Sequence, residues 1–185
     1  MAPLAGRPLV RHAAAALRSA VERGVLQGRL AVVRDLTSPL AALLEADGLM
    51  LVEAPDSDQG LGHSLRAGLE AAERSIPRGP AAVVIALGDQ PDIDPDVVEH
   101  LVLRWRTSGA DAVRPRYSGE PDVPGHPVLL DRRLWTQAER LSGDAGLGKL
   151  LRGGGLRLEL VDVSGHNPDI DTRADLLARD HPMET

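Results

Sequence analysis

The sequence predicts an α/β protein with a mostly parallel sheet and helices on both faces. Two observations carry this prediction. Val83–Leu87 is an unbroken apolar run, which is typical of a strand buried on both faces. Apolar segments of strand length also alternate with segments of helical periodicity from residue 8 to about residue 114, which indicates βα units.

Helices are expected where apolar residues recur at intervals of three and four. Ser38 followed by Pro39 supplies a capping hydroxyl and a first-turn proline, and Asp94 opens another helix in the same way. Gly24, Gly48 and Gly109 stand just past helix ends, where a glycine cap is favoured. The helices expected on these grounds span 9–21, 39–47, 62–76 and 95–108. The strands expected between them span 30–33, 49–52 and 83–87.

The rhythm changes in the last third of the chain. Arg114–Pro127 is rich in proline and glycine, which predicts a long loop lining a site. Strands are then expected at 128–130 and 156–163, and helices at 134–141, around 149–151 and at 172–178. Asp171 is the expected N-cap of the last helix.

Composition limits the classes of protein. The 185 residues suit a single domain, residues 1–185, large enough for its own core. There is no cysteine, which excludes disulfides and thiolate metal sites and is compatible with the cytoplasm. A formal charge of −6 argues against a nucleic-acid partner. No apolar run reaches 18 residues and no leader opens the chain, so a membrane location has no support.

Asp89 is the first candidate for a functional residue. It follows Gly88 at the carboxyl end of the 83–87 strand, the edge of an open α/β sheet where ligands bind. A carboxylate there suits Mg²⁺, which prefers oxygen ligands and substrate phosphates. The alternative is simple turn chemistry, since glycine, aspartate and the proline at 91 all favour turns.

Other motifs are weaker when taken alone. Asp171 is either a helix cap or a second metal carboxylate. Gly143–Lys149 matches the start of a P-loop, but Leu150 stands where a hydroxyl residue is needed and a predicted helix precedes it, so we reject that interpretation. His126 is a lone histidine. His63 and Ser64 head a helix, where they either cap it or offer groups to an anion.

Five segments, taken in order, resemble the MobA-like nucleotidyltransferases, and most closely the molybdenum-cofactor cytidylyltransferase branch. The resemblance runs from about residue 4 to residue 175. The segments are Gln59–Leu69, Gly88–Pro91, Gly125-His126-Pro127, Gly143-Asp144-x-Gly146 and Asp169–Thr172.

The resemblance implies a Rossmann-like domain of the nucleotide-diphospho-sugar transferase type. Such an enzyme moves a nucleoside monophosphate from CTP or GTP to a phosphorylated acceptor, such as molybdopterin cofactor, and releases pyrophosphate. It implies that Asp89 and Asp171 hold Mg²⁺ and that Gly60 and Ser64 lie near the nucleotide. It also implies that the acceptor-binding residues are Gly125, His126 and Pro127.

One departure from the family pattern stands out. The family begins with a strand and a glycine-rich loop that wraps the triphosphate, whereas this sequence opens at Met1-Ala2-Pro3-Leu4, which matches the family segment just after that loop. We therefore expect an N-terminally truncated domain without the first strand, its two neighbours left with unpaired edges. Either Met1 is an internal start of a longer reading frame, or the chain is a degraded relative. Self-association through an exposed edge is an option, so we expect a monomer or a homodimer.

Three alternatives to the transferase stay open. The chain could be an inactive binding or regulatory relative of this fold. It could be a nucleotide-sugar glycosyltransferase, because Asp92-Ile93-Asp94 and Asp169-Ile170-Asp171 both have the Asp-x-Asp form. Some relatives of this fold are labelled oxidoreductases of the nicotine-blue type, although no glycine fingerprint for a nicotinamide site is present.

Overall fold

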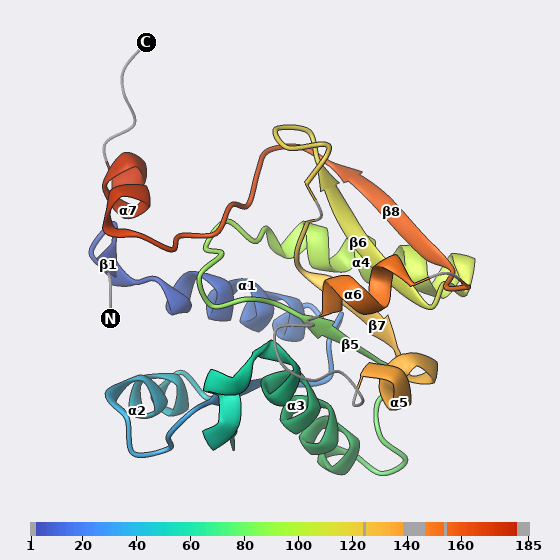
Figure 1. The fold of residues 1–185 in the computed structure, drawn as a ribbon, viewed down its shortest axis with the longest axis horizontal. Coiled ribbons are helices and arrows are strands. Elements are labelled where there is room, and N and C mark those ends of the chain that lie inside the picture. Colours follow the sequence, from blue (N-terminus) through green and yellow to red (C-terminus); the bar gives the residue numbers. More distant parts are fainter. Residues whose placement is uncertain (1–2, 124, 139–146, 154, 181–185) are drawn as a thin grey trace.

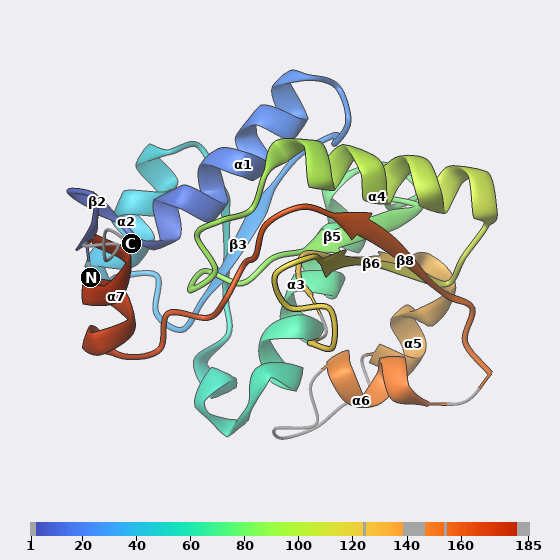
Figure 2. The same ribbon diagram turned by 90° about the horizontal axis from the view of Figure 1, so that it is seen from above.

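The computed structural model describes residues 3–123, 125–138, 147–153 and 155–180. Figure 2 shows a sheet layer between two layers of helices, as predicted. The helices on one face are α1 (Val10–Glu22) and α4 (Pro95–Ser108), with α2 (Pro39–Ala46) beside α1. Those on the other face are α3 (Leu61–Ser75), α5 (Trp135–Ala138) and α6 (Leu147–Arg152). Within the described residues, no helix has both the length and the apolar character needed to cross a membrane.

The strands form a four-stranded sheet and a separate parallel pair. The larger sheet has the order β5-β7-β6-β8, made of β5 (Ala82–Ile85), β7 (Val128–Asp131), β6 (Ala112–Tyr117) and β8 (Leu158–Val163). β7 is antiparallel to both neighbours, whereas β6 and β8 are parallel. The parallel pair is β3 (Leu30–Val33) and β4 (Met50–Glu53). The sheet is thus mixed, with β7 as its antiparallel strand.

β3 and β5 do not pair with each other, so each has one strand neighbour among the described residues. The helices nevertheless reach both. Ala14 of α1 packs with Val33 of β3, and Ala13 of the same helix packs with Val84 of β5. On the other face, Leu69 of α3 lies in one cluster with side chains of both strands. The open edges leave every residue of β5 partly exposed, whereas β7 is fully buried. Helices thus cover both faces of the 83–87 strand as expected, but its residues are only partly buried.

The predicted loop 114–127 is also wrong in its first part, which is strand β6. Residues 112–117 pair along their whole length with β8, but pairing with β7 stops at Val113. Pro115 therefore lies where the strand has one neighbour, and a strand tolerates a missing N–H donor there. The pattern of prolines hid this strand. The true loop begins after Tyr117 and ends at β7.

Short elements connect these layers. Pro55–Gln59 forms a 3₁₀ turn (η1) before α3, and Arg132–Leu134 forms another (η2) before α5. The end of the helix expected at 134–141 lies outside the described residues. An antiparallel hairpin, β1 (Pro3–Leu4) with β2 (Arg7–Pro8), opens the fold beside α7 (Arg173–Asp180), as Figure 1 shows. Leu4 packs against Ile170 and Leu176, so β1 lies next to the segment that leads into α7.

Candidate active site

Asp89 lies in the turn that follows β5, at the carboxyl edge of that strand. The turn is closely packed: a Cβ on Gly88 would lie 3.2 Å from Cγ2 of Val10, at the start of α1. The backbone carbonyl of Asp89 accepts a hydrogen bond of 3.0 Å from the amide of Ile170. Its carboxylate atom Oδ1 is buried and has no hydrogen-bond partner among the described residues. A polar atom left in this state costs free energy unless a ligand satisfies it.

The electrostatics of this position favour a cation. Burial raises the pKa of Asp89 and the negative charges of Asp169 and Asp171 raise it further, although its own backbone N–H acts in the opposite direction. A bound divalent ion would offset both effects and give Oδ1 a partner, so these residues fit Mg²⁺ or a similar hard cation. Within the described ranges, no group of three or more His, Asp and Glu side chains is placed to hold a metal.

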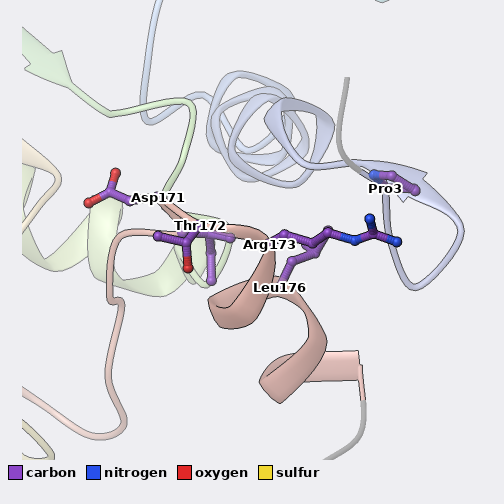
Figure 3. Close-up of a pocket in the computed structure, with 6 residues that line it drawn as sticks. Pro3, Asp171, Thr172, Arg173 and Leu176 are labelled. Carbon is purple, nitrogen blue, oxygen red and sulfur yellow. The ribbon is translucent and has the colours of Figure 1, made fainter.

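Asp171 is free for such a role because it does not cap α7. The cap is Thr172, whose Oγ1 accepts from the amide of Asp175, while Oδ2 of Asp175 accepts from the amide of Thr172. This reciprocal pair has the geometry of a capping box. Figure 3 shows the Asp171 carboxylate directed away from α7, whereas Arg173 extends toward Pro3 across a pocket of about 440 Å³. The prediction of an Asp171 cap was wrong by one residue.

Two buried amide side chains, Gln90 and Asn167, link Asp169 to the loop that carries His126. Nε2 of Gln90 donates to Oδ1 of Asp169 at 2.6 Å. Nδ2 of Asn167 donates to Oε1 of Gln90 at 3.3 Å and to the carbonyl of His126 at 3.2 Å. Neither Gln90 nor Asn167 was selected from the sequence as a site residue. The available signal was position, because each lies within two residues of a candidate aspartate.

The Gly125-His126-Pro127 segment is fixed from several sides. Nε and Nη2 of the buried Arg114 both donate to the carbonyl of Gly125, at 3.1 and 2.9 Å. The hydroxyl of Tyr117 donates to the carbonyl of His126 at 2.8 Å. A Cβ at position 125 would lie 2.6 Å from the carbonyl oxygen of Pro115, so only glycine fits. Pro127 follows a cis peptide bond.

His126 is neutral at ordinary pH. Burial and the nearby Arg114 cation lower its pKa to about 4, although Asp169 acts in the opposite direction. The ring therefore offers one donor and one acceptor nitrogen above that pH. A pocket of about 560 Å³ opens beside this network, with Asp92, Tyr117 and His166 among its lining residues.

Gly60 and Ser64 lie at the amino end of α3, as expected. Gly60 has φ of 124°, a conformation that favours glycine, and α3 has no side-chain cap there. The amide of His63 donates to the carbonyl of Gly60, and this end of α3 carries the positive end of the helix dipole. No hydrogen bond among the described residues connects either position to Asp89. The Gly143–Gly146 motif lies outside the described residues.

Comparison with known proteins identifies the family. The model of the MobA-like NTP transferase domain matches residues 1–162. The chain belongs to this family. No curated protein matches it significantly. The family resemblance suggested by the sequence motifs is thus confirmed, and nucleotidyl transfer is the chemistry it supports.

Three solved proteins illustrate the shared fold. Rv0371c from Mycobacterium tuberculosis H37Rv is 25% identical with a TM-score of 0.79, over 98% of this chain and 88% of that chain. A manganese complex of Rv0371c gives 23% identity and a TM-score of 0.74, over 97% and 89%. Molybdopterin-guanine dinucleotide biosynthesis protein A from Archaeoglobus fulgidus is 20% identical with a TM-score of 0.62, over 98% of this chain and 88% of that chain. CMP:2-keto-3-deoxy-manno-octonic acid synthetase complexed with CTP is 15% identical with a TM-score of 0.75, over 98% of this chain and 90% of that chain.

Proposed function

We propose that this chain is a nucleotidyltransferase that moves a nucleoside monophosphate from CTP or GTP to a small phosphorylated acceptor, such as molybdopterin cofactor, and releases pyrophosphate. The observation that carries the proposal is the buried Oδ1 of Asp89, which lacks a partner among the described residues, in a chain of the MobA-like family. The solved relatives include a molybdopterin-guanine dinucleotide biosynthesis protein and a synthetase with bound CTP, which supports nucleotide and acceptor of these classes.

Asp89 and Asp171 would hold Mg²⁺ in this enzyme. The ion would neutralise charge on the triphosphate and polarise the α-phosphoryl group. The manganese complex of Rv0371c supports a divalent ion of this kind. The positive end of the α3 dipole, at Gly60 and Ser64, suits the phosphates of the nucleotide.

The acceptor would approach from the segment Gly125-His126-Pro127. Its phosphate oxygen attacks the α-phosphorus, and the bond to the β-phosphate oxygen breaks to release pyrophosphate. Catalysis of this step depends mainly on positioning and on stabilisation of charge. The neutral His126 ring adds no charge to a site where phosphate groups meet, and its fixed loop defines the approach of the acceptor.

The test is a transfer assay with purified protein. CTP or GTP labelled at the α-phosphate is incubated with Mg²⁺ and molybdopterin, and both pyrophosphate and labelled acceptor are measured. We expect transfer by the wild type and loss of transfer in Asp89→Asn. The matched control is Asp131→Asn, which removes a carboxylate at the opposite edge of the sheet.

Three results would contradict the proposal. They are no transfer with either nucleotide at any Mg²⁺ or Mn²⁺ concentration, transfer by Asp89→Asn at the wild-type rate, and hydrolysis of nucleotide sugars in place of transfer. The first would favour an inactive binding relative, and the last would favour a glycosyltransferase.

A further inference from the structure

The hydrogen bonds of Gln90 and Asn167 have a fixed direction. The amide N–H of Asp92 can only donate, and it donates to Oδ1 of Asn167 at 3.0 Å. Nδ2 of Asn167 must therefore face the other way, toward two acceptors, Oε1 of Gln90 and the carbonyl of His126. Oε1 of Gln90 is then used as an acceptor, which turns its Nε2 donor toward Asp169. The backbone amide of Asp92 thus orients both side chains, so that the N–H donor of Gln90 faces the carboxylate of Asp169.

These two hydrogen-bonded amide side chains are shielded from water. Gln90 is 6% exposed and Asn167 is 4% exposed, so neither amide can exchange its partners for solvent at low cost. Asp169 is exposed, and a side chain of that kind normally samples several rotamers. The 2.6 Å bond from Gln90 restricts Asp169 to one of them. The buried amides therefore control a side chain at the surface of the site.

The controlled carboxylate belongs to the site of Asp89. Asp169 and Asp171 flank Ile170, which packs against Leu4, and the negative charges of both carboxylates act on Asp89. The amide of Ile170 also bonds to the carbonyl of Asp89, which fixes this segment beside the turn after β5.

We propose that Gln90, oriented by Asn167, is a positioning residue that holds the Asp169 carboxylate toward Asp89, so that Asp169 adds its charge to the field acting on a cation there. This inference rests on the proposed function, because it needs a divalent ion at Asp89. It adds two residues, Gln90 and Asn167, whose contribution passes through Asp169.

The test uses Mn²⁺ alone, with free Mn²⁺ followed by electron paramagnetic resonance during titration of the wild type and variants. Gln90→Met keeps the buried volume but removes the donor. We expect Gln90→Met and Asp169→Asn each to weaken Mn²⁺ binding about tenfold. The double variant is expected to bind no more weakly than Asp169→Asn, because the two residues act in series. Gln137→Met, on the exposed side of α5, is the matched control and keeps wild-type affinity.

Two results would overturn the inference. One is wild-type Mn²⁺ affinity in Gln90→Met. The other is a double variant whose loss equals the product of the two single losses, which would show that Gln90 acts only through general stability. Asp89→Asn separates this from the proposed function: if it binds Mn²⁺ as the wild type does, the cation is not at Asp89 and the proposed function itself fails. Asn167→Leu tests the same inference at another position, because it leaves Gln90 and Asp169 intact but removes the hydrogen bond that orients Gln90.

Discussion

Asp89 and Asp131 are two partly or fully buried carboxylates near opposite ends of β5, and their hydrogen-bond partners differ. Asp131 pairs in register with Ala82, the first residue of β5, whereas Asp89 lies beyond the last residue of that strand. Oδ1 of Asp131 accepts from both the amide and Nε of Arg133, and Oδ2 accepts from Nε1 of Trp105. Oδ1 of Asp89 has no such partner among the described residues.

The two pKa values move in opposite directions as a result. Burial raises the pKa of Asp131, but the hydrogen bonds from Arg133 and Trp105 outweigh it and leave the pKa below its usual value. Burial raises the pKa of Asp89, and neighbouring carboxylates add to the effect. Hydrogen bonds thus satisfy the carboxylate of Asp131, whereas Oδ1 of Asp89 is left for the proposed ligand. This is the physical distinction between a structural and a functional carboxylate.

The largest expected effect is the loss of activity in Asp89→Asn. Removal of this carboxylate should lower the rate of nucleotidyl transfer on the order of a hundred- to a thousandfold, because charge stabilisation at the phosphoryl group is lost. The same change should raise the melting temperature of the metal-free protein, since ionised Asp89 has a raised pKa and opposes folding at neutral pH. Calorimetry beside the rate assay checks both. A lower melting temperature would show that Asp89 is structural like Asp131.

The next effect concerns His126 and pH. Its pKa is about 4 in the folded protein and near 6.5 when unfolded, so between these values the unfolded chain binds more protons. Its contribution to stability is therefore complete above about pH 6.5, and falls by on the order of 3 kcal/mol as pH drops to 4. Urea denaturation at several pH values measures this, and His126→Gln should flatten the curve. An unchanged slope in that variant would contradict the burial of the ring.

Asp131→Asn should affect stability and leave the chemistry intact. The change removes the charge that three donors share, so we expect a loss of about 2 kcal/mol in the free energy of unfolding. The rate of transfer per folded molecule should stay at the wild-type value, because Asp131 lies at the edge of the sheet away from Asp89. A rate loss comparable to that of Asp89→Asn would remove the distinction between the two edges.

The sequence predicts local features of this site better than long-range ones. The place of Asp89 follows from a glycine directly after an apolar run, and α3 follows from the periodicity of its apolar residues. The partial exposure of β5 could not be predicted from its own residues, because burial depends on which strands lie beside it. β6 was missed because Pro115 weakens the strand pattern. The strand accommodates this proline because it pairs with β8, which lies more than 40 residues later in the sequence.

The amide network illustrates the same limit. Gln90 and Asn167 are 77 residues apart, and neither residue type indicates a site without its partner. Glutamine and asparagine are common on surfaces, so beyond their position near Asp89 and Asp169 the sequence does not indicate that these two are buried. Only the fold brings both beside His126 and buries them.

The smallest expected effect sharpens the assignment of Asp171. Because Thr172 is the N-cap of α7, Thr172→Ala should lower the free energy of unfolding by about 1 kcal/mol. Asp171→Asn should change it by less, since its carboxylate points away from the helix, yet should weaken Mn²⁺ binding. Chemical denaturation of both variants beside the Mn²⁺ titration provides the measurement. If Asp171→Asn destabilised the protein as much as Thr172→Ala and left Mn²⁺ binding unchanged, Asp171 would be a capping residue and Asp89 would need a different second ligand.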